Sequence, residues 1–354
     1  MNHFIIYCRS GFESEAASEI SVKAAEAGVY GYPKFDDLAG YIEFVINPPH
    51  DALQLMSKLR FRDLIFARQW IACEPMLQGV SSKDRLTPIS ESVAKLPKAS
   101  ELLVESADTT DGRNLNGLAK KLGSAAAGFL RQQDLLLPRK SKADYRLHIF
   151  LLENNEIWVG VSPINNSSKW EQGIKRLKFP ADAPSRSTLK LEEAWHYFIP
   201  QKAWDERLQR GMKAVDLGAA PGGWTYQLVK RGMFVTAVDN GPMKGDLMET
   251  GQVDHQREDA FTFAPAKPVD LMVCDVVDKP IRVIELMAKW AINGWADRLI
   301  FNLKLPMKKR YAEVSDRIQQ LEMMLQEHGI SYRLVSKHLY HDREEITCYL
   351  ELDV

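Results

Sequence analysis

Cysteine is scarce in this sequence and follows no pairing pattern. The 354 residues contain four cysteines, Cys8, Cys73, Cys274 and Cys348, and no two of them form a CxxC pair. A disulfide framework and a zinc site are therefore not expected. Reduced cysteines in a cytoplasmic protein are the simplest interpretation.

Long apolar runs are lacking as well. No stretch approaches the roughly 20 apolar residues that a membrane-spanning helix needs. The first residues, MNHFIIYCRSGFESE, contain too short an apolar core for a signal peptide, and acidic residues follow it too early. We therefore expect no membrane association.

An excess of charge of one sign is absent overall but present locally. The net charge is −1, which excludes a polycation. Residues 131–190, however, carry 11 Lys or Arg against 6 Asp or Glu. Two basic segments there, PRKSKADYR (138–146) and KWEQGIKRLKF (169–179), are interleaved with aromatic residues. A groove that contacts a phosphate backbone would show this bias, and a solvated surface is the alternative interpretation.

The pattern of strands and helices indicates an α/β protein of two or three domains. Residues 1–75 are predicted to form a ferredoxin-like α+β unit, with strands at 4–9, 41–46 and 64–72 and helices at 13–28 and 50–59. Residues 76–165 are predicted to form a second unit, with a strand at 101–106, a helix at 115–133, and strands at 146–152 and 156–164 joined by a turn at Glu153-Asn154-Asn155. Residues 166–186 show no periodicity and are predicted to be a basic linker.

The remaining residues, 187–354, predict a mostly parallel sheet covered on both faces. Four segments are almost continuously apolar, as buried parallel strands are: 215–218, 234–239, 269–275 and 298–305. A helix at 313–329 follows, and then two extended segments, SYRLVSKHLY and EITCYLEL. We expect these two segments to pair as a terminal hairpin.

The segment VDLGAAPGGW (215–224) joins the first of these strands to a helix through residues with almost no side chain. Such a turn lets a ligand approach the backbone closely. A phosphate-binding P-loop would need a lysine that is missing here, and the dinucleotide motif GxGxxG is absent. Asp216, Gly218, Gly222 and Gly223 are the candidate residues of this turn.

Two later acids indicate the kind of ligand. Asp239 ends the next strand about 20 residues further on, where an acid can bind both ribose hydroxyls of an adenosine. Asp259 lies further on, between the strands expected at 234–239 and 269–275, and is placed to meet the adenine amino group. A ligand with adenosine but no pyrophosphate fits this set, which predicts S-adenosylmethionine as the cofactor. A purely structural Gly-Pro turn is the alternative.

The residues around Asp275 limit which kind of substrate atom could accept a methyl group. Methylation of a base amino group commonly uses an Asp/Asn-Pro-Pro-aromatic segment, whereas the segment here is Asp275-Val276-Val277-Asp278. Methylation of a pyrimidine carbon needs a thiolate. Strand alternation points Cys274 away from the face of Asp275, so we interpret Cys274 as a core residue. Because the base amino group and the pyrimidine carbon are both disfavoured, we expect an oxygen atom to accept the methyl group.

A lysine near the end of an apolar strand supplies the candidate base. In FNLKL (301–305), Asn302 and Lys304 share one face. A sugar hydroxyl must lose its proton as it attacks the methyl carbon, and an amine can accept that proton if desolvation or a neighbouring cation lowers its pKa. Lys190 and the cofactor's sulfonium would be those cations, Asp275 would orient the amine, and Glu345 would hold the second lysine. No metal is needed, and a structural lysine that snorkels from the strand end is the alternative.

Five segments together resemble the FtsJ-type ribose 2′-O-methyltransferases: RSTLKLEEA (186–194), VDLGAAPGGW, VCD (273–275), NLK (302–304) and REE (343–345). The full length is similar to the RlmM family, bacterial enzymes that modify a cytidine ribose in 23S ribosomal RNA. The resemblance implies an N-terminal THUMP-containing RNA-binding region and a C-terminal Rossmann-like catalytic domain.

By position, the resemblance also implies a Lys-Asp-Lys-Glu tetrad with Lys304 as the proton acceptor. Its members would be Lys190, Asp275, Lys304 and Glu345, the last preferred to Glu344 because it directly precedes ITCYL. The candidate cofactor contacts are then Ser187, Asp216, Gly218, Ala220, Pro221, Gly222, Gly223, Trp224, Asp239, Asp259 and Asp275.

The expected partner is 23S ribosomal RNA or its precursor, bound by a monomer. The candidate RNA-binding residues are Arg139, Lys140, Lys142, Lys169, Lys175, Arg176, Lys178, Lys308, Lys309 and Arg310. A non-catalytic RNA-binding or ribosome-assembly factor that retains a cofactor pocket is the rival hypothesis. A nicotinamide-dependent oxidoreductase is disfavoured by the missing GxGxxG.

Overall fold

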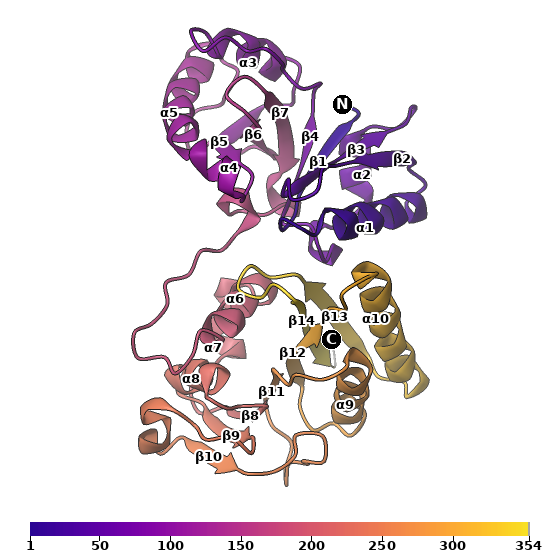
Figure 1. Cartoon of the computed structure of the whole chain (residues 1–354), viewed down its shortest axis with the longest axis vertical. Helices are drawn as coiled ribbons and strands as arrows, with labels where there is room; N and C mark the ends of the chain where they lie inside the picture. The colour runs from indigo at the N-terminus through magenta and orange to yellow at the C-terminus, as the bar shows by residue number, and fades with distance from the viewer. Residues whose placement is uncertain (353–354) are drawn as a thin grey trace. The chain divides into compact units, whose positions relative to one another are not determined.

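The linker predicted at residues 166–186 contains the boundary between two units of the structure. The computed structural model describes residues 1–352. Unit 1 comprises Met1–Ile174 and unit 2 comprises Lys175–Val354 (Figure 1). Each unit is built on a seven-stranded sheet of its own.

Unit 1 has the strand order β2-β3-β1-β4-β7-β6-β5. The strands are β1 (His3–Tyr7), β2 (Gly31–Lys34), β3 (Tyr41–Ile46), β4 (Gln69–Cys73), β5 (Ala99–Ser106), β6 (Tyr145–Leu151) and β7 (Ile157–Pro163). All neighbours are antiparallel except β5 and β6, which are parallel. The antiparallel pairing of β6 with β7 confirms the turn predicted at residues 153–155.

Helices connect the strands of unit 1. They are α1 (Glu13–Glu26), α2 (Ala52–Lys58), η1 (Phe61–Asp63), α3 (Leu86–Val93), α4 (Thr110–Asn114), α5 (Asn116–Gln132), η2 (Ile164–Asn166) and η3 (Glu171–Gly173). Asp51 begins α2 with a reciprocal cap: its carboxylate accepts the Gln54 N–H at 2.9 Å, and the Gln54 side chain accepts the Asp51 N–H. Buried Leu122, Ala126 and Leu130 of α5 belong to the same core as β6 and β7.

The strand predicted at residues 64–72 was wrong over its first half, because β4 begins only at Gln69. The backbone N–H of Phe66 is bound by the buried carboxylate of Glu19, at 2.9 Å, instead of by a neighbouring strand. This hydrogen bond to Glu19, 47 residues earlier in the chain, outweighs the local apolar pattern that predicts a strand from residue 64.

A short seam joins the two halves of this sheet. β4 pairs with β7 through Ala72↔Val161 and Cys73↔Gly160. A side-chain carbon at Gly160 would lie 2.3 Å from the Ala72 carbonyl oxygen, so only glycine permits this approach. The predicted units 1–75 and 76–165 therefore share one sheet, and their separation as domains stays a prediction.

Unit 2 has the strand order β10-β9-β8-β11-β12-β14-β13. The strands are β8 (Lys213–Leu217), β9 (Phe234–Val238), β10 (Val253–Gln256), β11 (Leu271–Cys274), β12 (Arg298–Lys304), β13 (Tyr332–Lys337) and β14 (Glu345–Leu352). The first five in the sheet order are parallel, and β14 is antiparallel to β12 and to β13. This confirms the predicted α/β class, the mostly parallel sheet and the terminal hairpin.

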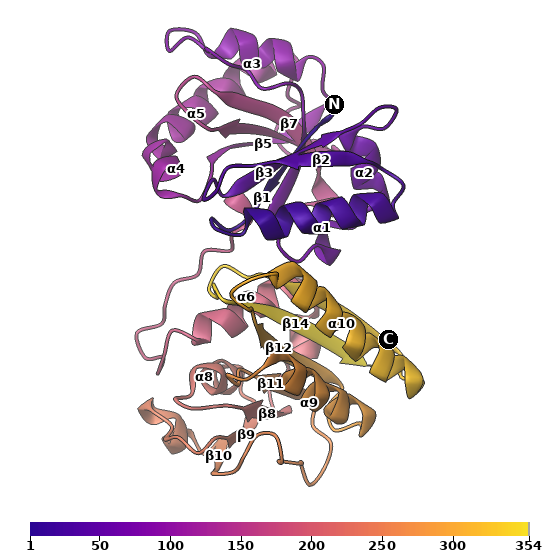
Figure 2. The same ribbon diagram turned by 45° about the vertical axis from the view of Figure 1, so that its right-hand side comes forward.

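Helices cover both faces of this sheet, with α9 and α10 packed together on one face and α6 and α8 on the other (Figure 2). The helices are α6 (Thr188–Phe198), η4 (Gln201–Ala203), α7 (Trp204–Arg207), α8 (Gly223–Lys230), η5 (Gly245–Thr250), α9 (Pro280–Ile292) and α10 (Arg310–Glu327). Over residues 1–352, no helix has both the length and the apolar character to span a membrane.

Candidate active site

One edge of the unit 2 sheet gathers the polar side chains that the sequence singled out. The carboxyl ends of parallel strands meet at one edge, where open α/β sheets bind ligands. Asp239 follows β9, Asp275 follows β11, and Lys304 ends β12. Because β14 runs antiparallel to β12, it begins at this same edge, and Glu345 lies directly opposite Lys304.

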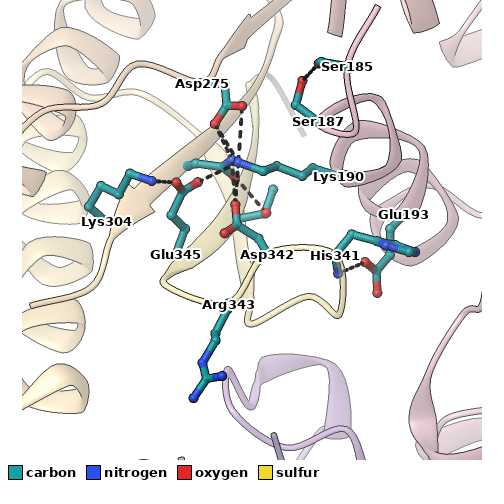
Figure 3. A network of polar contacts seen from close by, with 12 residues as sticks. Ser185, Ser187, Lys190, Glu193, Asp275, Lys304, His341, Asp342, Arg343 and Glu345 are labelled. Atoms are coloured by element: carbon teal, nitrogen blue, oxygen red, sulfur yellow. Dashed lines mark hydrogen bonds and ion pairs between the residues drawn. The ribbon is translucent and has the colours of Figure 1, made fainter. Parts of the chain in front are cut away.

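The four predicted tetrad residues are brought together here (Figure 3). The Lys190 Nζ lies 3.4 Å from both carboxylate oxygens of Asp275 and 3.3 Å from Glu345 Oε2. The other oxygen of Glu345 pairs with Lys304 Nζ. The Glu345 side chain is 1% exposed and that of Lys304 is 35% exposed, so the second lysine keeps an open side.

The neighbouring Glu344 is arranged differently. Its side chain is 52% exposed and pairs with Arg343 at 3.1 Å and with Arg310 at 3.9 Å. The geometry therefore favours Glu345 over Glu344 as the acid that holds both lysines.

A buried hydrogen-bond chain fixes the carboxylate of Asp275. Asn302, on β12, donates from Nδ2 to Asp275 Oδ1 at 2.8 Å. Thr347, on β14, donates from its hydroxyl to the Asn302 side-chain oxygen, also at 2.8 Å. Because both supporting residues lie on strands, Asp275 is held by the rigid part of the fold.

A fifth charged residue, Asp342, joins the cluster and was not predicted. Its carboxylate is buried and lies 2.9 Å from Lys190 Nζ. Burial raises the pKa of Asp342 above its ordinary value. Burial acts to lower the pKa of Lys190, but the carboxylates of Asp275 and Asp342 outweigh it, so that pKa is raised. Asp342 lies outside the five segments singled out in the sequence, and its position three residues before Glu345 was the one signal there.

The three carboxylates of this cluster could also be considered as metal ligands. Asp275, Asp342 and Glu345 each offer an oxygen, and these oxygens all lie within 4.8 Å of one another. The ammonium of Lys190 contacts all three, so it already supplies their counter-charge. That no metal is needed stays a prediction.

The glycine-rich turn lies between β8 and α8, beside the cluster. Gly218 has a φ of +77°, which favours glycine, and a side-chain carbon there would lie 2.8 Å from Val276. The carboxylate of Asp239 accepts the Ala220 N–H at 3.1 Å and the Gly241 N–H at 2.7 Å. Asp239 therefore lies against the turn, which is where a residue that binds the nucleoside part of the cofactor would be expected.

The other predicted cofactor residues differ in their surroundings. Ser187 begins α6, and its hydroxyl packs so closely on Gly223 that a side-chain carbon there would lie 2.0 Å away. Trp224 is buried in the hydrophobic core of unit 2, so any cofactor contact would come from its backbone. Asp259 is exposed and accepts the Phe261 N–H at 2.9 Å.

Asp216 is completely buried in β8. It accepts a hydrogen bond of 2.6 Å from the Thr225 hydroxyl. Burial raises its pKa to about 7, against the effect of that hydrogen bond. Asp216 is therefore placed to fix the start of α8 behind the turn, and its role as a cofactor contact stays a prediction.

Cys274 is fully buried, which confirms its interpretation as a core residue. Burial raises the pKa of its thiol to about 12. A thiolate nucleophile is therefore disfavoured at this position.

The predicted RNA-binding residues are mostly exposed and lie in both units. Arg139, Lys140, Lys142 and Lys169 belong to unit 1, and Lys175, Arg176, Lys178, Lys308, Lys309 and Arg310 belong to unit 2. In unit 2, Arg176 donates to the Tyr340 hydroxyl at 3.4 Å, and Arg310 pairs with Glu344. The two basic segments of unit 2, 175–178 and 308–310, therefore each contact the loop at residues 338–344, which leads into Glu345.

Comparison with known proteins covers nearly the whole chain. Three family models match it in succession: an RlmM ferredoxin-like domain over residues 1–71, the N-terminal part of ribosomal RNA large subunit methyltransferase M over residues 84–163, and an FtsJ-like methyltransferase over residues 183–305. A ribosomal RNA large subunit methyltransferase M from Photorhabdus sp. (strain Az29) is 48% identical over 352 residues, covering 99% of this chain and 96% of the relative. The protein of the same name from Edwardsiella ictaluri (strain 93-146) is 49% identical over 351 residues, covering 99% and 94%.

Among solved structures, TrmN from Thermus thermophilus aligns over 99% of both chains. The TM-score is 0.36 and the sequence identity is 12%, a likeness too low to support an argument.

Proposed function

The chain belongs to the family of ribosomal RNA large subunit methyltransferase M, and from this premise we propose that it methylates the 2′-hydroxyl of a cytidine ribose in 23S ribosomal RNA or its precursor. The methyl donor is S-adenosylmethionine. The observation that carries the proposal is the cluster of Lys190, Asp275, Lys304 and Glu345 beside the glycine-rich turn. Two lysines and two acids at a ligand-binding sheet edge suit proton removal from a hydroxyl.

The residues around the turn fit this cofactor. The turn carries almost no side chain, which leaves room for the methionine part, and Asp239 offers a carboxylate for the ribose hydroxyls. Ser187, the Ala220–Gly223 segment and Asp275 would complete the contacts, with Asp259 near the adenine. When bound, the cofactor supplies an electrophilic methyl group on a sulfonium.

The chain's own side chains would move the proton. Lys304 would accept the proton of the 2′-hydroxyl as its oxygen bonds to the methyl carbon, and the carbon–sulfur bond of the sulfonium would break with its electron pair left on sulfur. Glu345 holds Lys304 across the strand pair, while Asp275 and Lys190 fix the other side of the cluster. The step needs the uncharged form of the Lys304 amine.

RNA would approach the cluster over basic surfaces. The segments 175–178 and 308–310 both contact the loop before β14, so they flank the cluster and can hold phosphates near the target sugar. Unit 1, with its predicted THUMP-like part at 76–165, would bind a further part of the RNA through Arg139, Lys140, Lys142 and Lys169. A ribosomal RNA substrate implies action in the cytoplasm, and we propose a monomer as the active form.

The proposal is tested by incubating the protein with S-adenosylmethionine labelled in the methyl group and with unmodified 23S ribosomal RNA. We expect label on one cytidine, in a linkage that blocks alkaline cleavage of the backbone there, because only a 2′-O-methyl group removes the attacking hydroxyl. Label on a base would contradict the ribose assignment. RNA binding with no transferred label would favour the assembly-factor hypothesis.

Replacing Asp239 by alanine should weaken S-adenosylmethionine binding about 30-fold, or on the order of 2 kcal/mol, because hydrogen bonds to a charged acceptor are lost. Calorimetry measures this directly. Asp254→Ala, an exposed acid on the neighbouring strand β10, is the matched control and should change the affinity less than twofold. Equal affinities for wild type and Asp239→Ala would remove Asp239 from the cofactor site.

A further inference from the structure

Asp342 is the carboxylate closest to Lys190, although it lies outside the Lys-Asp-Lys-Glu set. The distance from Lys190 Nζ is 2.9 Å for Asp342, against 3.4 Å for Asp275 and 3.3 Å for Glu345. Asp342 also lies 3.4 Å from Asn302 Nδ2, the same amide that binds Asp275. Figure 3 shows its carboxylate pointing at the Lys190 amine from the side opposite Asp275.

The loop that carries Asp342 is held in place by the same helix that carries Lys190. Glu193, one turn further along α6, is buried and accepts the backbone N–H groups of Tyr340 and His341, both at 2.9 Å. Residues three apart on a helix lie on one face. Helix α6 therefore fixes both partners, the amine directly and the loop of Asp342 through Glu193.

The donors of Lys190 match the number of acids around it. An ammonium has three N–H donors, and three carboxylates surround this one. Glu345 uses Oε2 for Lys190 and Oε1 for Lys304. Without Asp342, the Lys190 amine would move toward the two remaining acids and compete with Lys304 for Glu345.

We propose that Asp342 is a positioning residue for methyl transfer: it anchors the Lys190 ammonium so that Glu345 stays shared with Lys304. The role rests on the proposed function of the cluster. The charged groups that face Asp342 include Lys190 from α6, Asp275 after β11, Lys304 on β12 and Glu345 on β14.

Three variants test this role: Asp342→Asn, which keeps the shape and removes the charge, Asp342→Glu, which restores the charge, and Glu344→Gln as the matched control. Glu344 is two residues away but exposed. We expect Asp342→Asn to lower kcat on the order of 10-fold with KM for RNA within twofold, because a displaced catalytic group slows chemistry more than binding. Asp342→Glu should recover part of kcat, and Glu344→Gln should keep the wild-type kcat, even if its KM for RNA changes because Glu344 pairs with Arg310.

A second measurement does not depend on activity. The Lys190 side-chain nitrogen of 15N-labelled protein is titrated by NMR in the wild type, Asp342→Asn and Glu344→Gln. The pKa of Lys190 should fall in Asp342→Asn and stay unchanged in Glu344→Gln, because one of the acids that raise it is gone only in Asp342→Asn.

The two measurements separate the possible failures. An unchanged Lys190 titration in Asp342→Asn would overturn the positioning role whether or not the protein methylates ribose. Absence of ribose methylation by the wild type, together with a shifted Lys190 titration, would remove the proposed function and leave the Asp342–Lys190 contact in place. Loss of S-adenosylmethionine binding in Asp342→Asn would show that Asp342 supports the fold in general, which also overturns the proposal.

Discussion

Replacing Lys304 by methionine should lower kcat for ribose methylation about 1,000-fold and leave S-adenosylmethionine affinity unchanged. Methionine keeps the apolar stem of the side chain but cannot accept a proton. Lys304 ends β12 at the ligand-binding edge and contacts Glu345 across the strand pair, so its removal takes away the proposed base without disturbing the core.

The measurement is single-turnover methylation of the RNA at saturating cofactor, with calorimetry for cofactor binding. Lys309→Met is the matched control, because Lys309 is exposed and lies at the start of α10. The control should lose RNA affinity and keep most of kcat. Methylation by Lys304→Met within about threefold of wild type would exclude Lys304 as the base.

Replacing Lys190 by methionine should lower the free energy of unfolding by about 3 kcal/mol at pH 7.5, because buried carboxylates lose the cation that compensates them. The Lys190 side chain is only 18% exposed, so solvent cannot replace the missing charge well. Asp275, Asp342 and Glu345 would then repel one another at the distances described above.

The loss of unfolding free energy in Lys190→Met should become smaller as the pH falls. Burial already raises the pKa of Asp342 from 3.8, and Lys190 is the nearest group that lowers it, so removing Lys190 raises it further. A carboxyl group whose pKa is higher in the folded state than in the unfolded state binds its proton more tightly in the folded state. Protonation of such a group at low pH therefore stabilises the folded protein. The recovery begins near that raised pKa and is complete below 3.8.

Urea unfolding at several pH values between 4 and 7.5 would measure this dependence. Lys190→Arg keeps a positive charge and should lose less stability than Lys190→Met at pH 7.5. A deficit that is the same at every pH would mean that packing of the lysine stem, and not charge compensation, supplies the stability.

The C-terminal sheet was predictable because its inner strands are apolar on both faces. Burial between two helical layers imposes near-continuous apolar runs, and the glycine-rich turn marks where the first run stops. In each unit one edge strand was missed, β2 in unit 1 and β10 in unit 2, since GYPK and VDHQ are short and polar. An edge strand is less buried than an inner strand, so its sequence need not show a continuous apolar run.

The candidate site was predictable where strands position it. Lys304 and Glu345 follow from the alternation of β12 and from the start of β14. Asp342 could not be predicted in the same way, because its loop is shaped by hydrogen bonds to Glu193, a residue about 150 positions earlier that no local pattern connects to it.

The seam at Gly160 has a consequence for how unit 1 can be divided into parts. Two short pairings hold the halves of its sheet together, and they tolerate no side chain at that position. A cut in the connection between β4 and α3 would leave two open strand edges, each a template for aggregation. We therefore expect unit 1 to fold properly only when it is expressed as one piece.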